Sequence, residues 1–471
     1  MPDRSPTISF LGAAENVTGS RHLLQVNGLN ILVDCGLYQE RNLRDRNWDK
    51  FPIRPNTIDA VLLTHAHLDH CGLIPKLAKE GFQNKIYCTA ATAEIAKIVM
   101  QDCGNLLEED AAFKRKRHKR EGRKSPRPIE PLYTSDDALA CFDLFAPVKY
   151  KQVIKMDRDI EVTFYDAGHI LGSSVIKVKF LLNGEIRTIL FSGDVGRNDR
   201  PIIQDPEVLN EADYILIEST YGDRTHETLE DTRAKLADAV NSAKRAGGNI
   251  IVPSFAIERS QEILYYLNEL QLEKLIPPLR VFLDSPMAVR VTDVFKHHPE
   301  MFDDEMTDYM NHHESPFDFQ GLKMVRTTSQ SKAINKIKGT VMIIAGSGMC
   351  TGGRIKHHLV NHIWRPESTV LFVGYQAVGT LGRQIVEGAE AVRILGKTYQ
   401  VKARIVQALG FSSHADKNEL LEWLSGLKKP PRHVFVVHGE TNAAHYFAKY
   451  ITEQKGWSAS APHYNDTVKL D

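Results

Sequence analysis

The chain lacks the sequence signals that direct a protein into or across a membrane. None of its apolar runs approaches the roughly 18 residues that a membrane-spanning helix needs. Its first ten residues, MPDRSPTISF, do not contain the apolar block of a secretory signal peptide. We therefore expect a soluble, cytoplasmic protein with no membrane partner.

Cysteine and net charge are also scarce. The 471 residues include only six cysteines, scattered without a CxxC pair, which is typical of free thiols. Lys and Arg total 59, and so do Asp and Glu, so the overall charge gives no reason to expect nucleic-acid binding. Attraction of a polyanion depends on where the charges lie, however, so a local basic surface stays open.

One segment has a strong local charge. KRKRHKREGRK (114–124) contains eight Lys or Arg among eleven residues. Such a run is usually a solvated face, and the other interpretation is a surface that attracts a polyanion. The sequence leaves both open.

Apolar runs closed by turn residues predict short strands in the first part of the chain, at 7–12, 22–26, 30–34 and 59–64. From about residue 226 the pattern changes to alternating helices and buried-type strands, such as the strand at 249–254 and the helix at 258–271. This alternation predicts a second, α/β domain. Near the end of the chain, the sequence again resembles the first part.

Histidines follow the strand at 59–64 in a dense group. His65, His67, Asp69 and His70 form an HxHxDH motif directly after that strand. His65 and His67 are two residues apart, so in an extended turn they can point the same way, while Asp69 and His70 can serve a second centre. Imidazole and carboxylate are ligands of zinc, and an open position for water makes such a site catalytic. The motif predicts a metal centre.

This motif resembles that of the metallo-β-lactamase fold. The other ligands of that fold have counterparts here in the same order, each after an apolar run and beside a glycine: Asp34, His169 and Asp194. Glycine lets a loop approach a metal closely. An aspartate at a strand end is also a common turn residue, so Asp34 alone has that second interpretation.

The large insertion identifies the branch of the fold. It and the segment that follows it carry the motifs LIESTYGDR (216–224), VPSFAIERSQE (252–262), GSGMCTGGR (346–354), YQAVGTLGRQ (375–384), FSSHAD (411–416) and VVHGE (436–440). Over nearly the whole chain they resemble the β-CASP metallo-β-lactamase nucleases, close to the cleavage and polyadenylation endonuclease type of bacteria and archaea. The resemblance implies an α/β protein, an αββα sandwich with an inserted α/β β-CASP domain. The implied parts are 1–206 and 397–471 for the sandwich and 207–396 for the insertion.

The resemblance also implies roles for single residues. Two Zn²⁺ ions per chain would be held, one by His65, His67 and His169, the other by Asp69, His70 and His438, with Asp194 bridging them. Asp34 would accept an N–H from a ligand histidine. His414 would act as general acid, kept protonated by its partner Glu218.

RNA is the implied substrate. Members that process RNA resemble this sequence in having a histidine at position 438, where the DNA cross-link repair branch typically has valine. The implied reaction is hydrolysis of RNA phosphodiester bonds by hydroxide activated by two metals, as an endonuclease, a 5′–3′ exonuclease or both, in RNA processing or decay. A homodimer stays open. The alternatives are a small-molecule hydrolase of thioesterase or lactamase type, a DNA-repair nuclease and a non-catalytic scaffold.

Glycine and arginine motifs in the insertion suggest contacts to RNA phosphates. Small residues after a strand let backbone N–H groups approach a phosphate, and arginine binds phosphate in bidentate fashion. The candidates are Arg259, Ser347, Gly348, Arg354 and Arg383. The other interpretation, tight turns and structural ion pairs, stays open for each.

Overall fold

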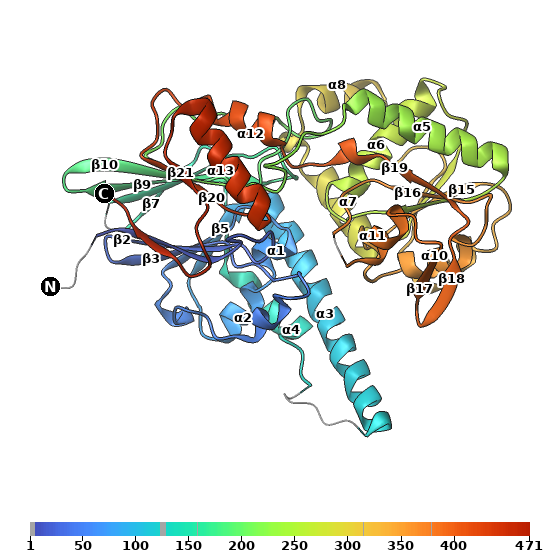
Figure 1. Ribbon diagram of the computed structural model, residues 1–471, viewed down its shortest axis with the longest axis horizontal. Coiled ribbons are helices and arrows are strands. Elements are labelled where there is room, and N and C mark those ends of the chain that lie inside the picture. The colour runs from blue at the N-terminus through green and yellow to red at the C-terminus, as the bar shows by residue number, and fades with distance from the viewer. Residues whose placement is uncertain (1–4, 123–128, 158, 314, 378) are drawn as a thin grey trace. The chain divides into compact units, whose positions relative to one another are not determined.

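The computed structural model describes residues 5–122, 129–157, 159–313, 315–377 and 379–471 (Figure 1). It divides into two compact units. Unit 1 comprises Met1–Asp199, Gln204–Thr225 and His414–Asp471, and unit 2 comprises Arg200–Ile203 and His226–Ser413. Among the described residues, no helix is both long enough and apolar enough to cross a membrane. All six cysteines are free, as the sequence predicts, and all six are buried.

Unit 1 is built on two seven-stranded sheets. The first has the order β22 (Thr467–Lys469), β1 (Thr7–Gly12), β2 (Arg21–Val26), β3 (Leu29–Val33), β4 (Ala60–Leu62), β5 (Lys85–Thr89), β6 (Phe145–Val148). The second has the order β21 (Ala459–Ser460), β20 (His433–Val436), β11 (Tyr214–Ile217), β10 (Glu185–Phe191), β9 (Ser174–Leu182), β8 (Ile160–Asp166), β7 (Val153–Met156). The last residues of the chain thus complete both sheets.

The two sheets pack face to face around one shared core. Successive side chains of a strand point to opposite faces. Accordingly, Ile31 and Val33 of β3 join the core shared with Val178 of β9, while Leu32 between them is buried on the other face. A strand of this kind must be apolar on both sides, which is why the predicted strands read as continuous apolar runs.

Helices cover the outer faces of the sandwich. On the first sheet, α3 (Ala90–Glu121) lies against β5 and β6, and α1 (Leu68–Cys71), α2 (Ile74–Lys79) and α4 (Ser135–Ala140) belong to the same layer (Figure 1). On the second sheet, Trp423 of α12 (Lys417–Leu424) and Phe447 of α13 (Thr441–Lys455) pack on Ile215 and Val434. The layers are therefore α, β, β, α, as predicted.

Unit 2 contains a six-stranded parallel sheet. Its order is β14 (Leu322–Met324), β13 (Arg280–Leu283), β15 (Val341–Ala345), β12 (Ile250–Pro253), β16 (Thr369–Phe372), β19 (Arg404–Gln407). A two-stranded ribbon and helices complete it: β17 (Ala391–Ile394), β18 (Lys397–Gln400), α5 (Leu229–Ala246), α6 (Arg259–Leu272), α7 (Pro286–His297), α8 (Asp304–His312), α9 (Thr328–Ile334), α10 (Ile355–His362) and α11 (Leu381–Val386). Parallel strands connected by helices are buried on both faces, which explains the all-apolar runs of β12 and β15.

The bounds of unit 2 differ from the insertion 207–396 expected from the sequence. β11 pairs in parallel with β10 and β20, so residues 207–225 belong to the sandwich. β19 pairs in parallel with β16, so residues 397–413 belong to unit 2. Pairing between strands that are distant in the sequence decides both bounds, and the local sequence pattern does not reveal which strands pair.

Candidate metal centre

The predicted ligands come from strand ends at one edge of the sandwich in unit 1. Asp34 follows β3, and His65 follows β4, which runs parallel to β3. In the second sheet, His169, Asp194, Glu218 and His438 follow β8, β10, β11 and β20, which all run in one direction. Since parallel strands end at the same edge, their following loops meet there. The HxHxDH segment continues from this edge into α1, a single helical turn that carries Asp69 and His70.

Two glycines allow the loops to come together. A side chain on Gly36 would place its Cβ 1.6 Å from the carbonyl oxygen of Asp69, so only glycine fits between the Asp34 loop and α1. Gly193, with φ of 55°, packs its Cα against Thr64 and directs the chain into Asp194.

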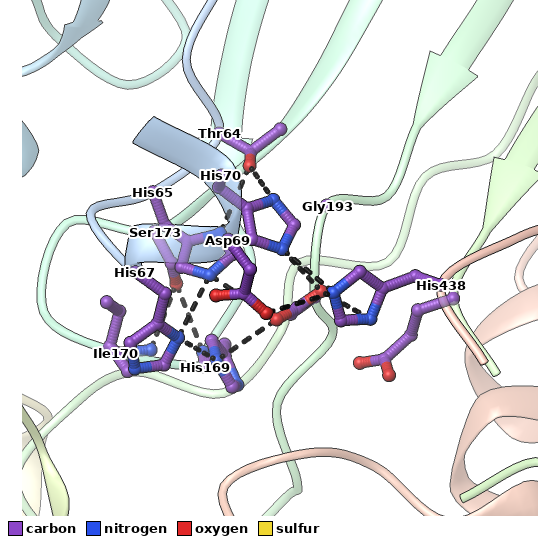
Figure 2. Close-up of polar contacts among 12 residues, drawn as sticks. Thr64, His65, His67, Asp69, His70, His169, Ile170, Ser173, Gly193 and His438 are labelled. Atoms are coloured by element: carbon purple, nitrogen blue, oxygen red, sulfur yellow. Dashed lines mark hydrogen bonds and ion pairs between the residues drawn. The ribbon is translucent and has the colours of Figure 1, made fainter. Parts of the chain in front are cut away.

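Three imidazoles and one carboxylate form the first donor set. Nε2 of His65 lies 3.1 Å from Nδ1 of His67, and Nε2 of His169 lies 3.3 Å from the same nitrogen (Figure 2). Oδ2 of Asp194 lies 3.3 Å from Nε2 of His65 and 3.5 Å from Nε2 of His169. The four donor atoms all lie within 4.8 Å of one another.

The second donor set lies on the other side of Asp194. Nε2 of His70 is 3.0 Å from Nε2 of His438, which is 3.6 Å from Oδ2 of Asp69 (Figure 2). Oδ1 of Asp194 is 3.4 Å from Nε2 of His70 and 3.4 Å from Nδ1 of His438. One carboxylate therefore directs its two oxygens at two separate groups of donors.

The donor set fits a divalent cation. Oδ1 of Asp194 is buried and accepts no hydrogen bond. Burial lowers the pKa of His65 to about 3 and the pKa of His67 to about 4, so both rings are neutral near pH 7 and keep a lone pair. Imidazole nitrogens and carboxylate oxygens are ligands of divalent cations, and four such donor atoms converge within 4.8 Å of one another in the first set. We conclude that the cluster binds divalent metal.

Asp34 lies behind this cluster and holds His70. Its Oδ2 accepts a hydrogen bond from Nδ1 of His70 at 2.7 Å, and its Oδ1 accepts one from the backbone N–H of Thr64 at 2.8 Å. The first bond engages Nδ1 of His70 and orients the ring so that Nε2 faces the donor set. The second fixes the chain one residue before His65. Asp34 is not just a turn residue, since its carboxylate orients the site.

His414 and Glu218 form a pair beside the first donor set. Nδ1 of His414 lies 3.2 Å from both carboxylate oxygens of Glu218, and its ring lies 4.5 Å from that of His169. Glu218 is fully buried and also accepts the backbone N–H of Val195 at 2.8 Å. Burial disfavours the charged ring, but Glu218 outweighs it and raises the pKa of His414 to about 9. The side chain of His414 keeps 21% of its surface exposed, so a protonated imidazole is accessible at this site.

Thr220 supports the site and was not predicted. Its hydroxyl lies 3.1 Å from Nδ1 of His438 and donates to the backbone carbonyl of the same residue at 3.2 Å. It therefore fixes a predicted ligand, which lies more than 200 residues further along the chain. The available signal was its place two residues after Glu218 in LIESTYGDR, although nothing in that motif says which histidine it meets.

The predicted phosphate-binding residues all lie in unit 2 and have contacts of their own there. Arg354 donates to Oδ1 of Asp284 at 2.7 Å and to the backbone carbonyl of Arg326 at 3.1 Å. Arg259 pairs with Glu262 at 2.8 Å, and Arg383 pairs with Glu387 at 2.6 Å. These ion pairs agree with the structural interpretation of the arginines, and phosphate binding by them stays a prediction.

Ser347 and Gly348 shape the loop after β15. The hydroxyl of Ser347 accepts the backbone N–H of Gly352 at 3.2 Å and contacts Thr351. A Cβ on Gly348 would lie 2.7 Å from the ring of Phe255, so the ring requires glycine at this position. Phosphate binding by this loop also stays a prediction.

Three family models match the chain. A metallo-beta-lactamase superfamily domain covers residues 23–204, a Beta-Casp domain covers 260–385, and a Zn-dependent metallo-hydrolase RNA specificity domain covers 398–462. Among solved structures, a protein of unknown function from Enterococcus faecalis V583 aligns with 99% of this chain and 100% of its own at a TM-score of 0.55 and 13% identity. That likeness supports the fold alone.

Curated relatives match over nearly the whole chain. A ribonuclease of Thermus thermophilus is 37% identical over 459 residues, which are 98% of this chain and 99% of the relative. The transcription termination factor FttA of Methanosarcina mazei is 31% identical over 482 residues, 99% of this chain and 72% of the relative. With the sandwich, the inserted unit and the His/Asp cluster in place, the chain belongs to the β-CASP family of metallo-β-lactamase-fold metallo-hydrolases.

Proposed function

We propose that this protein is a zinc-dependent ribonuclease that hydrolyses RNA phosphodiester bonds at a two-metal centre. The observation that carries the proposal is the position of Asp194, whose two carboxylate oxygens face two separate donor sets. The similarity to a ribonuclease over 98% of the chain and the RNA specificity domain model at 398–462 support RNA as the substrate.

The two donor sets divide the ligands between two ions. His65, His67 and His169 would hold the first, and Asp69, His70 and His438 the second, with Asp194 bridging. When bound, such metals lower the pKa of water and neutralise the charge that develops on a phosphate. Asp34 engages Nδ1 of His70, so that Nε2 of that ring faces the donor set, and Thr220 holds the ring of His438 in place.

His414 is suited to protonate the leaving group. Its Nδ1 is engaged by Glu218, so the proton to be donated is the one on Nε2. Because the pKa of His414 is raised to about 9, this proton is present near neutral pH. Donation from Nε2 to the departing 3′ oxygen would leave a 3′ hydroxyl on one product and a 5′ phosphate on the other. Glu218 orients the ring and stabilises its charged form.

The wider role is part of the same proposal. The protein would act as an endonuclease, a 5′–3′ exonuclease or both, in cytoplasmic RNA processing or decay, and a homodimer stays a prediction. Sedimentation velocity tests the dimer, and cleavage of a circular RNA separates the endonuclease from a 5′ exonuclease, which needs a free end.

Substrate class is tested by direct comparison. The protein loaded with zinc is incubated with labelled RNA, with DNA of the same sequence and with an acyl thioester. We expect RNA cleavage that a chelator abolishes and that His67→Ala loses together with bound metal. His445→Ala removes an exposed histidine of unit 1 outside the cluster and should leave cleavage unchanged. Turnover of the thioester or of DNA alone would overturn the proposal, and so would full RNA cleavage by His67→Ala.

A further inference from the structure

The exposed end of α3 carries a dense group of positive charges. Six basic residues occupy two turns before the helix ends at Glu121: Lys114, Arg115, Lys116, Arg117, Lys119 and Arg120. All six are exposed, and Glu121 is the one acidic residue between 114 and 121. The remaining basic residues of the run, Arg123 and Lys124, lie outside the described part of the chain.

The other end of α3 is anchored at the metal centre. The hydroxyls of Thr89 and Thr92 both donate to the carbonyl of Gly172 at 2.7 Å, in the loop that carries His169. Further along, Gly104 packs so closely on α4 that a Cβ there would lie 2.8 Å from the backbone of Ser135. At a rise of about 1.5 Å per residue, the basic turns lie roughly 33 to 42 Å along the axis from Thr92. The helix thus connects the reaction centre to a distant patch of positive charge.

The arrangement of the charges favours RNA over a lipid surface as the partner. Successive residues of a helix are rotated by about 100°, so basic side chains at consecutive positions surround the helix rather than line one face. A helix that lies on a lipid surface needs an apolar face opposite its basic one, and residues 114–121 contain no apolar residue. Phosphates that approach from several sides, as on a folded or paired RNA, match a ring of charge.

Local ion pairs do not neutralise this ring. Lys114 pairs with Asp110 at 2.6 Å, and Arg117 with Glu121 at 3.5 Å. Both are exposed pairs between residues four apart, which contribute at most about 0.5 kcal/mol and exchange readily for phosphate contacts. Arg115 donates to the carbonyl of Ile129 through Nη1 and keeps its charge.

We propose that residues 114–121 of α3 bind the phosphate backbone of the substrate RNA at a distance from the cleaved bond, so that long RNAs are held more tightly than short ones. This inference rests on the proposed ribonuclease function, because it concerns the same substrate. It gives the basic run a function in binding RNA, separate from the chemistry at the metal centre.

The test measures binding and cleavage separately. One variant replaces all six basic residues with Gln, which keeps helix propensity. A matched control replaces six dispersed, exposed lysines of unit 1 with Gln and so loses the same charge: Lys50, Lys151, Lys155, Lys428, Lys429 and Lys449. Binding of a long RNA is measured without metal between about 50 and 200 mM salt. An RNA of about four nucleotides, which covers about 14 Å when stacked at roughly 3.4 Å each, serves as the short substrate.

For the long RNA, we expect the α3 variant to lower the slope of log affinity against log salt by about 2 to 4 and to weaken binding at least tenfold. The dispersed control should change the slope by less than about 1. Cleavage of the short RNA and the melting temperature should match the unaltered protein in both variants. An unchanged slope, or equal slopes in the two variants, overturns the inference while the metal-dependent cleavage still stands. The inference would also be overturned if the α3 variant no longer bound anionic lipid vesicles while it still bound the long RNA like the unaltered protein.

Discussion

Charged residues behave differently in the two units of this protein. In unit 1 the histidines and Asp194 bring donor atoms to one point, where Oδ1 of Asp194 accepts no hydrogen bond. In unit 2 the arginines singled out by the sequence are engaged with carboxylates of their own unit, as Arg354 is with Asp284. Donors that converge around a buried oxygen that accepts no hydrogen bond indicate a cation site. Satisfied ion pairs stabilise the fold of unit 2, and they do not by themselves indicate a ligand.

Asp194→Asn should give the largest effect. The amide keeps the shape but loses the charge that faces both donor sets, so we expect loss of bound metal and a fall in RNA cleavage of at least about 10³-fold. Metal content by mass spectrometry and single-turnover cleavage measure this. Asp49→Asn, on an exposed aspartate of the same unit, should change neither quantity. Retained metal and activity in Asp194→Asn would show that the two donor sets do not depend on this carboxylate.

His414→Ala should separate proton donation from metal binding. Because His414 lies beside the donor sets without completing them, we expect metal content to be unchanged while cleavage slows by about 10² to 10⁴. An RNA with a leaving group that needs no proton should recover most of the rate. If the variant loses its metal, His414 is a ligand instead and the assignment of the general acid is wrong.

Asp34→Asn tests the residue behind the cluster. Removing the acceptor of the Nδ1 proton of His70 should weaken metal affinity by about 10- to 100-fold, since such outer partners orient the ligand ring. Competition with a chromophoric chelator gives the affinity. Saturating metal should then restore most of the cleavage rate, and an affinity equal to that of the unaltered protein would reduce Asp34 to a turn residue.

The pH profile tests the His414–Glu218 pair. Glu218 raises the pKa of His414 to about 9, so the ring is protonated below that pH and loses its proton as the pH rises through it. Cleavage limited by proton donation should therefore fall above about pH 9. In Glu218→Gln the falling limb should move to lower pH, because the neutral amide no longer favours the charged ring. If the fall in cleavage occurs at the same pH in Glu218→Gln, or is still present in His414→Ala, it reports the titration of another group.

Substitutions of arginines in unit 2 should give the smallest effects, and Arg354→Gln sharpens the interpretation of that unit. It leaves the buried carboxylate of Asp284 with His358 and Ser331 but without its cation, so we expect a loss of about 1 to 3 kcal/mol in the free energy of unfolding. Urea denaturation measures it. Arg383→Gln breaks an exposed ion pair within one helix turn, a pair that contributes no more than about 0.5 kcal/mol. RNA affinity of Arg383→Gln therefore reports on phosphate contact with little interference from stability.

The sequence was sufficient to predict much of the metal centre. The seven predicted ligands meet in unit 1 because the segments that carry them follow strands that end at one edge of the sandwich. The role of Thr220 could not be predicted from the sequence, since its partner His438 comes near only when β11 and β20 pair. The bounds of the inserted unit could not be predicted for the same reason, because β19 pairs with a strand that is distant in the sequence. Local pattern indicates which residues can bind, and long-range pairing decides what they meet.

The central claim is that Asp194 lies between two metal ions. Diffraction from crystals grown with zinc, recorded on both sides of the zinc absorption edge, tests it most directly. We predict two anomalous peaks per chain, roughly 3.5 to 4 Å apart, with one oxygen of Asp194 directed at each. A single peak confined to His65, His67 and His169, or no peak at the cluster, would contradict the account.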